Sequence, residues 1–199
     1  MPYPDAPWQL HGQLWLSLFR VRPGDDPHHP DRPAGVYGAA LVSYEAPSPL
    51  TYSELLVARP VGTQAQVTDI WVDSPDSRDG GRELWAIPKD LATFRRTTGS
   101  GTVDRTTWEV AHDGRPSVTA RFSDVSRRAP ARLPFAFATR QVRADGEVVV
   151  TRVTGSGRAL PCRSHWEADA EGPLAWLSGK RPLASFRVAD FAMSFGDRR

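Results

Sequence analysis

Residues 81–92 read Gly-Arg-Glu-Leu-Trp-Ala-Ile-Pro-Lys-Asp-Leu-Ala, and they place Lys89 in a largely apolar stretch. The only other lysine is Lys180, so arginine supplies nearly all of the chain's cationic side chains. An arginine keeps its proton, whereas a desolvated lysine loses it near neutral pH and adds to carbonyl carbons as a Schiff-base former. We therefore predict that Lys89 is a nucleophile. The alternative is a structural lysine that follows a short helix and extends its ammonium group to water.

The segment around Lys89 is the most helix-compatible part of the chain. A helix is expected from Asp79 to Phe94, with Gly80 and Gly81 at its start and Pro88 as an internal break. The remainder predicts about ten strands, because short alternating runs are separated by proline and glycine. The expected strands are Trp8 to Val21, Gly35 to Tyr44, Tyr52 to Pro60, Ala65 to Val72, Thr102 to Ala111, Ser117 to Ser123, Phe135 to Arg143, Val148 to Thr154, Arg158 to Glu167 and Leu183 to Phe195.

Two turns and one long loop separate these strands. The Asp-Gly pairs within residues 112–115 and 144–147 supply the positive φ that tight hairpin turns require. Residues 24–33 are rich in proline and aspartate and are expected to form a mobile loop, with a lid over the barrel mouth as its alternative role. His28 and His29 in this loop lack a framework for a metal site, so we expect neither a metal ion nor another cofactor.

Many short strands with one helical interruption favour a strongly curved antiparallel sheet that closes on itself, because closure removes exposed edges. The predicted fold class is mainly β (α+β): a single-domain antiparallel β-barrel with an apolar central cavity and one or two short helices. Seven tryptophans are many for this length, and several of them would give such a cavity an apolar wall.

Length and composition limit the function classes. The 199 residues suit one domain over residues 1–199, and a net charge of +2 with acids and arginines mixed along the chain disfavours nucleic-acid binding. The single cysteine, Cys162, excludes an intramolecular disulfide and is expected to be a small, partly buried apolar residue. No long apolar run predicts membrane insertion or export, so a soluble cytoplasmic protein is expected.

The segment Gly81-Arg82-Glu83, followed by Pro88-Lys89 and Leu91, resembles the signature of the acetoacetate decarboxylase family. Weaker similarity covers most of the chain, including residues 7–11, 52–54, 72–73, 172–174 and 182–183. The resemblance implies an antiparallel β-barrel or cone around an apolar cavity, and a homo-oligomer. It also implies that Lys89 is the Schiff-base lysine and that Glu54 is an acidic residue facing the cavity, with Arg82 and Glu83 forming an ion-paired scaffold for the lysine.

Three positions depart from the family pattern. Asp90 stands where the family has a second lysine, Gln13 stands near the position of an arginine, and a second cavity glutamate is replaced near Ala39. A carboxylate at residue 90 would raise the pKa of Lys89 if its side chain came close, and Gln13 has no charge to hold a substrate carboxylate. Simple decarboxylation of a small β-keto acid is therefore disfavoured. The resemblance extends to relatives in natural-product pathways that carry out aldol condensation, dehydration or cyclisation.

The leading hypothesis is a lyase or cyclase that acts on a small carbonyl or polyketide-type molecule in secondary metabolism, such as antibiotic biosynthesis. Lys89 would form an imine and Glu54 would move protons at the α-carbon. The first alternative is a non-covalent cyclase in which Lys89 only donates a hydrogen bond. The second is a small-molecule-binding barrel without turnover. Substrate-binding side chains are expected at Gln13, Trp15, Trp71, Trp85 and Arg163, and a structural role next to Lys89 is expected for Arg82, Glu83 and Asp90.

Overall fold

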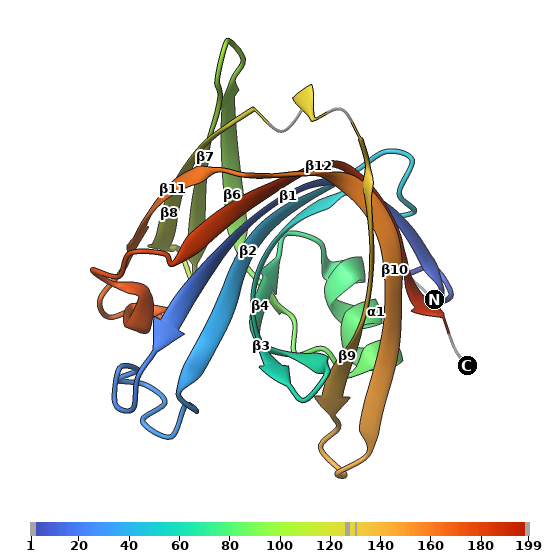
Figure 1. Cartoon of the computed structure of the whole chain (residues 1–199). Coiled ribbons are helices and arrows are strands. Elements are labelled where there is room, and N and C mark those ends of the chain that lie inside the picture. Colours follow the sequence, from blue (N-terminus) through green and yellow to red (C-terminus); the bar gives the residue numbers. More distant parts are fainter. Residues whose placement is uncertain (1–2, 126–127, 130, 198–199) are drawn as a thin grey trace.

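The computed structural model describes residues 3–125, 128, 129 and 131–197. These residues form two sheets, one α-helix and a short 3₁₀ helix (Figure 1). Among them, no helix has the length and apolar character needed to span a bilayer. The helices are α1 (Pro75–Trp85) and η2 (Ala175–Leu177). The strands are β1 (Trp8–Val21), β2 (Gly35–Glu45), β3 (Tyr52–Val61), β4 (Gln64–Val72), β5 (Asp90–Leu91), β6 (Thr93–Gly99), β7 (Asp104–His112), β8 (Arg115–Asp124), β9 (Leu133–Val142), β10 (Val148–Pro161), β11 (Arg163–Ala168) and β12 (Ala184–Asp197).

The larger sheet closes into a barrel. Its strand order is β3-β2-β1-β12-β10-β9-β4-β5, and an additional β3–β4 pairing completes a ring that leaves only the short β5 outside. The pairings in the ring are antiparallel except between β4 and β9, which are parallel and share the single pair Ala65 and Thr139. Helix α1 packs beside β4 and β10 and is visible through the ring in Figure 1. The predicted barrel is therefore confirmed.

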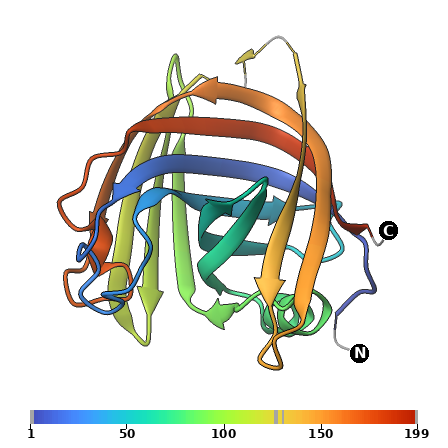
Figure 2. The ribbon, with the colours of Figure 1, turned by 60° about the horizontal axis from the view of Figure 1, so that its bottom comes forward.

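The second sheet, in the order β11-β8-β7-β6, covers the outside of the barrel at β1, β2 and β3 (Figure 2). A buried cluster between the two sheets contains Trp15 and Phe19 of β1, Leu41 of β2, Trp108 of β7 and Trp166 of β11. Strands β1 to β3 are consequently apolar on both faces, because alternate side chains point to the barrel interior and to the second sheet.

The helix differs in its bounds from the sequence prediction. It begins at Pro75, where the Ser74 side chain accepts a hydrogen bond from the Ser77 N–H as an N-cap, and proline suits the first turn. It ends at Trp85, because Ala86 adopts the left-handed conformation (φ 55°) that stops the helix before Pro88. Thr93 and Phe94, the last residues of the predicted helix, belong instead to strand β6.

Strand β10 is continuous where two strands are predicted. Gly155 and Gly157 lie at the predicted break between two strands, but the structure places both inside β10. A Cβ atom on Gly155 would stand 2.5 Å from the Ala192 carbonyl oxygen, and one on Gly157 would stand 2.4 Å from Val188. Glycine is needed here for close packing against β12, and not for a turn. Both predicted Asp-Gly hairpins are present, between β7 and β8 and between β9 and β10.

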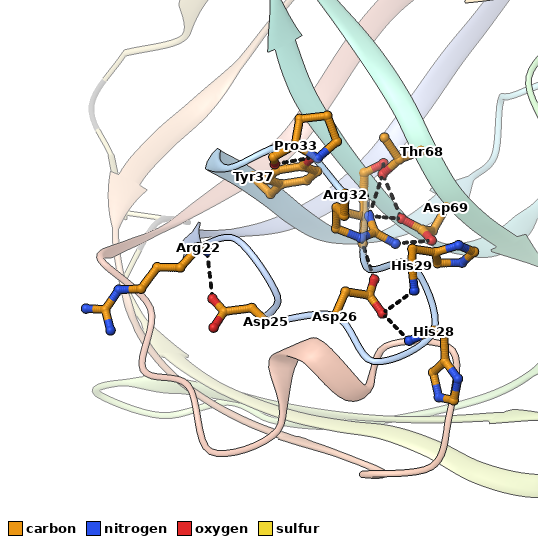
Figure 3. A network of polar contacts seen from close by, with 11 residues as sticks. Arg22, Asp25, Asp26, His28, His29, Arg32, Pro33, Tyr37, Thr68 and Asp69 are labelled. Atoms are coloured by element: carbon orange, nitrogen blue, oxygen red, sulfur yellow. Dashed lines mark hydrogen bonds and ion pairs between the residues drawn. The ribbon is translucent and has the colours of Figure 1, made fainter.

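Ion pairs fix the loop between β1 and β2 to the outside of the barrel (Figure 3). The buried Arg32 guanidinium lies 2.5 Å from Asp26 and 2.8 Å from Asp69 of β4, and Asp26 also accepts hydrogen bonds from the backbone N–H groups of His28 and His29. Lys180 binds Asp25 at 2.6 Å. Residues 24–33 contribute nothing to the lining of the barrel cavity, so the structure gives no support to a lid role for this loop.

Candidate active site

The barrel encloses a cavity of about 520 Å³. Among the described residues that line it, Lys89 and Glu54 are the only charged side chains, and Tyr44, Tyr52 and Thr139 are the other polar ones. The remaining lining residues are apolar or glycine and come from the barrel strands and from residues 85–87: Trp8, Leu10, Leu14, Leu16, Ala40, Val42, Leu56, Ala58, Ala65, Val67, Ile70, Trp85, Ile87, Leu133, Pro134, Phe135, Phe137, Val153, Gly157, Ala159, Val188, Phe191, Met193 and Phe195.

Lys89 and Glu54 form a buried ion pair. The Lys89 Nζ donates hydrogen bonds to Glu54 Oε2 at 2.9 Å, to Ser77 Oγ at 2.9 Å and to the Tyr52 hydroxyl at 3.4 Å. The second oxygen of Glu54, Oε1, accepts a hydrogen bond from the Tyr44 hydroxyl at 3.0 Å. Lys89 is 4% exposed and Glu54 is 3% exposed. The charged atoms are thus satisfied within the protein, as burial of a charge requires.

Strand alternation and the end of helix α1 bring these groups together. Tyr52 and Glu54 are two residues apart on β3 and therefore point to the same side of the sheet, into the barrel. Lys89 follows the left-handed residue Ala86, which turns the chain back toward the barrel after the helix. The Arg82 Nε donates to the Lys89 carbonyl oxygen at 2.6 Å and holds this segment against the helix.

Gly81 makes room for the lysine stem. A Cβ atom at this position would stand 2.7 Å from Lys89 Cδ and 2.8 Å from Lys89 Cε, distances that real Cβ atoms essentially never show. Gly80 has the same role toward a different partner, because its Cβ would stand 2.7 Å from the ring of Trp8. The two glycines therefore lie inside α1 for packing reasons, at a cost in helix propensity.

Burial and the neighbouring groups act on the pKa of Lys89 in opposite directions. Burial lowers it, but the Glu54 carboxylate and Tyr52 outweigh burial and leave the pKa of Lys89 above its ordinary value. Burial, supported by the charge of Glu54, raises the pKa of Tyr44 well above its ordinary value, and burial also raises the pKa of Tyr52. The expectation of a lowered Lys89 pKa is therefore corrected: without a ligand, this site holds an ammonium group and two protonated phenols.

Asp90, Arg82 and Glu83 lie next to the site but face away from the cavity. The Asp90 carboxylate accepts a hydrogen bond from the Leu91 N–H at 2.8 Å, and it is Glu54, not Asp90, that lies beside the lysine ammonium. Arg82 pairs with Asp90 at 3.8 Å and not with Glu83, whose side chain accepts a hydrogen bond from Tyr3. The expected Arg82–Glu83 scaffold is thus replaced by an Arg82 contact to the lysine backbone.

Four of the five side chains predicted to bind substrate lie outside the cavity, and only Trp85 lines it. Trp15 and Trp71 point in the opposite direction on their strands and belong to the core between the sheets. Gln13 accepts a hydrogen bond from Arg187 at 2.8 Å and donates one to Asp190 at 3.0 Å, on the outer face of β1. Arg163 is an exposed residue of the second sheet.

Ala39 faces the second sheet, and its neighbour Ala40 lines the cavity. Sequence reasoning also missed Tyr44, Tyr52 and Ser77. Strand alternation could have identified the tyrosines. Tyr52 is two residues from Glu54 and Tyr44 is two residues from Val42, so each tyrosine shares a face with that residue. No pattern marks Ser77, which the sequence analysis places outside the helix.

No protein-family model and no curated protein sequence matches the chain. Its structure is nevertheless similar to solved structures over nearly its whole length. The acetoacetate decarboxylase of Legionella pneumophila superposes with a TM-score of 0.63 at 14% identity, covering 98% of this chain and 87% of that one. The enduracididine biosynthesis enzyme MppR, solved with pyruvate, gives 0.68 at 17% identity and covers 98% and 90%. An acetoacetate decarboxylase-like enzyme from Sphingomonas wittichii gives 0.63 at 14% identity and covers 98% and 92%.

Proposed function

We propose that this chain, which has the fold of acetoacetate decarboxylase and its relatives, is an enzyme that activates a carbonyl compound as an imine on Lys89. The observation that carries the proposal is the Lys89–Glu54 pair at 2.9 Å in the wall of an apolar cavity. A lysine serves as an amine nucleophile when a base can take its proton and the surroundings exclude water. At this site Glu54 is the base, and the apolar lining of the cavity excludes water.

The first step is proton transfer along the existing hydrogen bond. When a substrate enters the cavity, a proton passes from the Lys89 ammonium to Glu54, which exchanges a buried ion pair for two neutral groups. The free amine adds to the carbonyl carbon, and protonated Glu54 returns its proton to the carbonyl oxygen. Glu54 then carries a second proton from the nitrogen to the new hydroxyl group, which leaves as water. This gives the iminium ion and leaves Glu54 as a carboxylate again.

The second step uses the same carboxylate as a base. The iminium ion acidifies the α-carbon, and Glu54 accepts the α-proton to give an enamine. The enamine carbon then adds to an electrophilic carbonyl, within the same molecule or on a second one. Tyr44 and Tyr52, both protonated, can donate hydrogen bonds to the oxygen atoms that change charge during these steps.

Aldol condensation, dehydration or cyclisation fits this cavity better than loss of carbon dioxide. Apart from Lys89, the described lining has no cationic side chain that would hold a substrate carboxylate. One structural neighbour, MppR, was solved with the condensation product of pyruvate and imidazole 4-carboxaldehyde, at 16% identity. This likeness supports a carbon–carbon bond-forming role for our chain in secondary metabolism.

A second candidate function is non-covalent. The raised pKa of Lys89 favours a site in which the ammonium group keeps its proton and donates a hydrogen bond to a substrate carbonyl. The apolar cavity would then fold a polyketide-type substrate for cyclisation, and proximity would supply most of the rate.

Trapping with cyanoborohydride separates the two candidates, because only an imine is reduced to a stable amine. We expect the wild-type protein to gain the mass of a ketone or aldehyde, peptide mapping to place that mass on Lys89, and Lys89→Met to lose it. Lys180, the only other lysine, is partly exposed in its ion pair with Asp25 and serves as the internal control for non-specific reaction outside the cavity. Turnover of a carbonyl substrate that persists in Lys89→Met would refute the imine mechanism and favour the hydrogen-bonding one.

A further inference from the structure

We infer that the substrate of this site is an uncharged, mostly apolar aldehyde or ketone whose chain extends from Lys89 along the inside of β3. The inference rests on the proposed function for the position of the carbonyl group. It adds the chemical class of the substrate, which the lysine chemistry alone leaves open.

Apart from Thr139 of β9, which lies near Ala65 toward the other end of β3, the polar groups of the cavity gather at one end of the inner face of β3. Tyr52 and Glu54 are there, with Lys89 beside them and Tyr44 on the neighbouring strand. The next inward-facing residues along β3 are Leu56 and Ala58. Because a strand rises about 3.3 Å per residue, the cavity wall continues for roughly 13 Å beyond Glu54.

Small side chains create the space along this wall. Ala40 of β2 lies opposite Leu56, and Gly38 lies opposite Ala58. Ala65 of β4 and Ala159 of β10 line other parts of the same cavity. The interior of a barrel of this size is ordinarily filled by its own side chains. Alanine at these positions therefore leaves room for an elongated ligand.

Charge at this wall is already balanced. Lys89 and Glu54 are the only charged side chains among the described lining residues, and they neutralise each other. A carboxylate, phosphate or ammonium group on the substrate chain would be desolvated without a partner, which disfavours its binding. Each apolar carbon of the chain instead gains free energy on leaving water.

The mouth of the cavity is also apolar. Leu133 and Phe137 of β9 line the cavity and are 55% and 45% exposed. Large apolar side chains that face both solvent and cavity favour the entry of an apolar molecule over a charged one.

The test compares four carbonyl probes by the rate of cyanoborohydride trapping on Lys89: butanal, octanal, the ω-carboxylate analogue of octanal, and pyruvate. We expect octanal to be trapped at least tenfold faster than butanal at equal low concentration, and both charged probes to be trapped no faster than butanal. Equal rates for all four probes would overturn the inference and leave the imine mechanism intact.

Two variants test where the chain lies. Ala40→Leu and Ala159→Leu enlarge side chains in the cavity wall, so in each variant octanal should lose its advantage over butanal. Ala136→Leu, at an exposed position on the outer face of β9, is the matched control and should keep the advantage. An advantage that survives in both cavity variants, shown to be folded by thermal unfolding, would overturn the inference.

A ligand without a carbonyl group separates failure of the inference from failure of the proposed function. Octanol cannot form an imine, and its binding is followed by calorimetry. If no probe is trapped on Lys89 but octanol binds and Ala40→Leu weakens that binding, the imine proposal fails while the chain site stands. If octanol does not bind and trapping shows no dependence on chain length, the inferred site fails.

Discussion

At the scale of single residues, the Glu54 carboxylate decides the protonation state of Lys89. Replacing it with glutamine leaves burial as the main influence on the lysine, and burial favours the neutral amine. In Glu54→Gln the pKa of Lys89 should therefore fall, and the alkaline rise in the rate of imine trapping should move to lower pH. A pH profile of octanal trapping in wild type and variant measures this shift.

The same variant separates two roles of Glu54. Because glutamine cannot accept an α-proton, exchange of the substrate α-hydrogen for deuterium should fall at least a hundredfold, a typical contribution of a positioned general base. Nuclear magnetic resonance of the recovered ketone reports the exchange. An unchanged pH profile together with full exchange would show that another group serves as the base.

Gly81 offers a second test at this scale. In Gly81→Ala the new methyl group would meet the Lys89 stem at 2.7 Å, so we expect imine trapping to fall at least tenfold although alanine is the better helix former. Gly80→Ala is the matched comparison, because its methyl group would meet Trp8 and not Lys89. Gly80→Ala should lower the melting temperature while retaining trapping. Equal trapping losses in the two variants would argue against a specific lysine contact.

The residue types also show how far sequence alone predicts the site. Lys89 is identifiable because lysine is so rare in this chain, and Glu54 is identifiable from the family resemblance. Their mutual contact is not, since it joins a strand to a segment 35 residues away. The direction of the lysine pKa shift could not be predicted either, because it depends on whether a carboxylate lies close enough to outweigh burial.

At the scale of elements, alternation along a strand predicts which side chains share a face. On β1, Leu10, Leu14 and Leu16 line the cavity, so Gln13 and Trp15 must face the other way. The alternation along β1 could be read from the sequence, but the burial of its outer face under a second sheet could not. The outer face of β1 is as apolar as its inner face because the second sheet covers it.

The end of helix α1 gives a prediction at this scale. Ala86 holds a left-handed conformation (φ 55°) that glycine adopts without strain. Ala86→Gly should therefore raise the free energy of unfolding by about 0.5–1 kcal/mol, because relief of strain exceeds the entropy that glycine adds to the unfolded chain. Urea unfolding measures the change, and imine trapping should stay within twofold of wild type. A lower stability in the variant would mean that the Ala86 side chain makes a compensating contact.

At the scale of the whole molecule, the Arg32 network fastens the β1–β2 loop to the barrel. Arg32→Met leaves the buried Asp26 and Asp69 carboxylates without their guanidinium, which should cost about 3–5 kcal/mol of unfolding free energy. Imine trapping in the folded protein should not change, because the loop is not part of the cavity lining. Arg95→Met, which breaks an exposed pair with Glu109, is the control and should cost less than about 1 kcal/mol.

The loss of unfolding free energy caused by Arg32→Met should depend on pH. Burial raises the pKa of Asp26, but Arg32 and the backbone N–H groups of His28 and His29 outweigh burial and lower it overall. A lowered folded-state pKa gives stability that is present above the ordinary carboxyl pKa and is lost as the pH falls through the lowered value. The difference between wild type and variant should therefore shrink in acid. A constant difference down to strongly acidic pH would show that the pair contributes through packing alone.

The class of fold was predictable from the spacing of strands and turns, because local alternation and Asp-Gly hairpins survive in the structure. The closure of the ring and the position of the second sheet were not, because both depend on pairings between distant strands. The glycines show this limit: Gly80 and Gly81 read as the start of a helix, and Gly155 and Gly157 read as a break between strands. Each is instead required by a side chain or strand that packs against it in the folded chain.

The ring of strands has its weakest pairing between β4 and β9. Strands β4 and β9 meet through the single pair Ala65 and Thr139, reinforced by a 3.3 Å hydrogen bond from the Gln141 side chain to the Val67 carbonyl oxygen, whereas the other neighbours share long ladders. Local opening should begin where the fewest hydrogen bonds must break. Amide hydrogens on the facing edges of β4 and β9 should therefore exchange with solvent sooner than those of β1 and β12. A molecule bound inside the barrel would slow that exchange. Amide exchange at the β4–β9 edge would therefore show whether the cavity is occupied, without any chemical reaction.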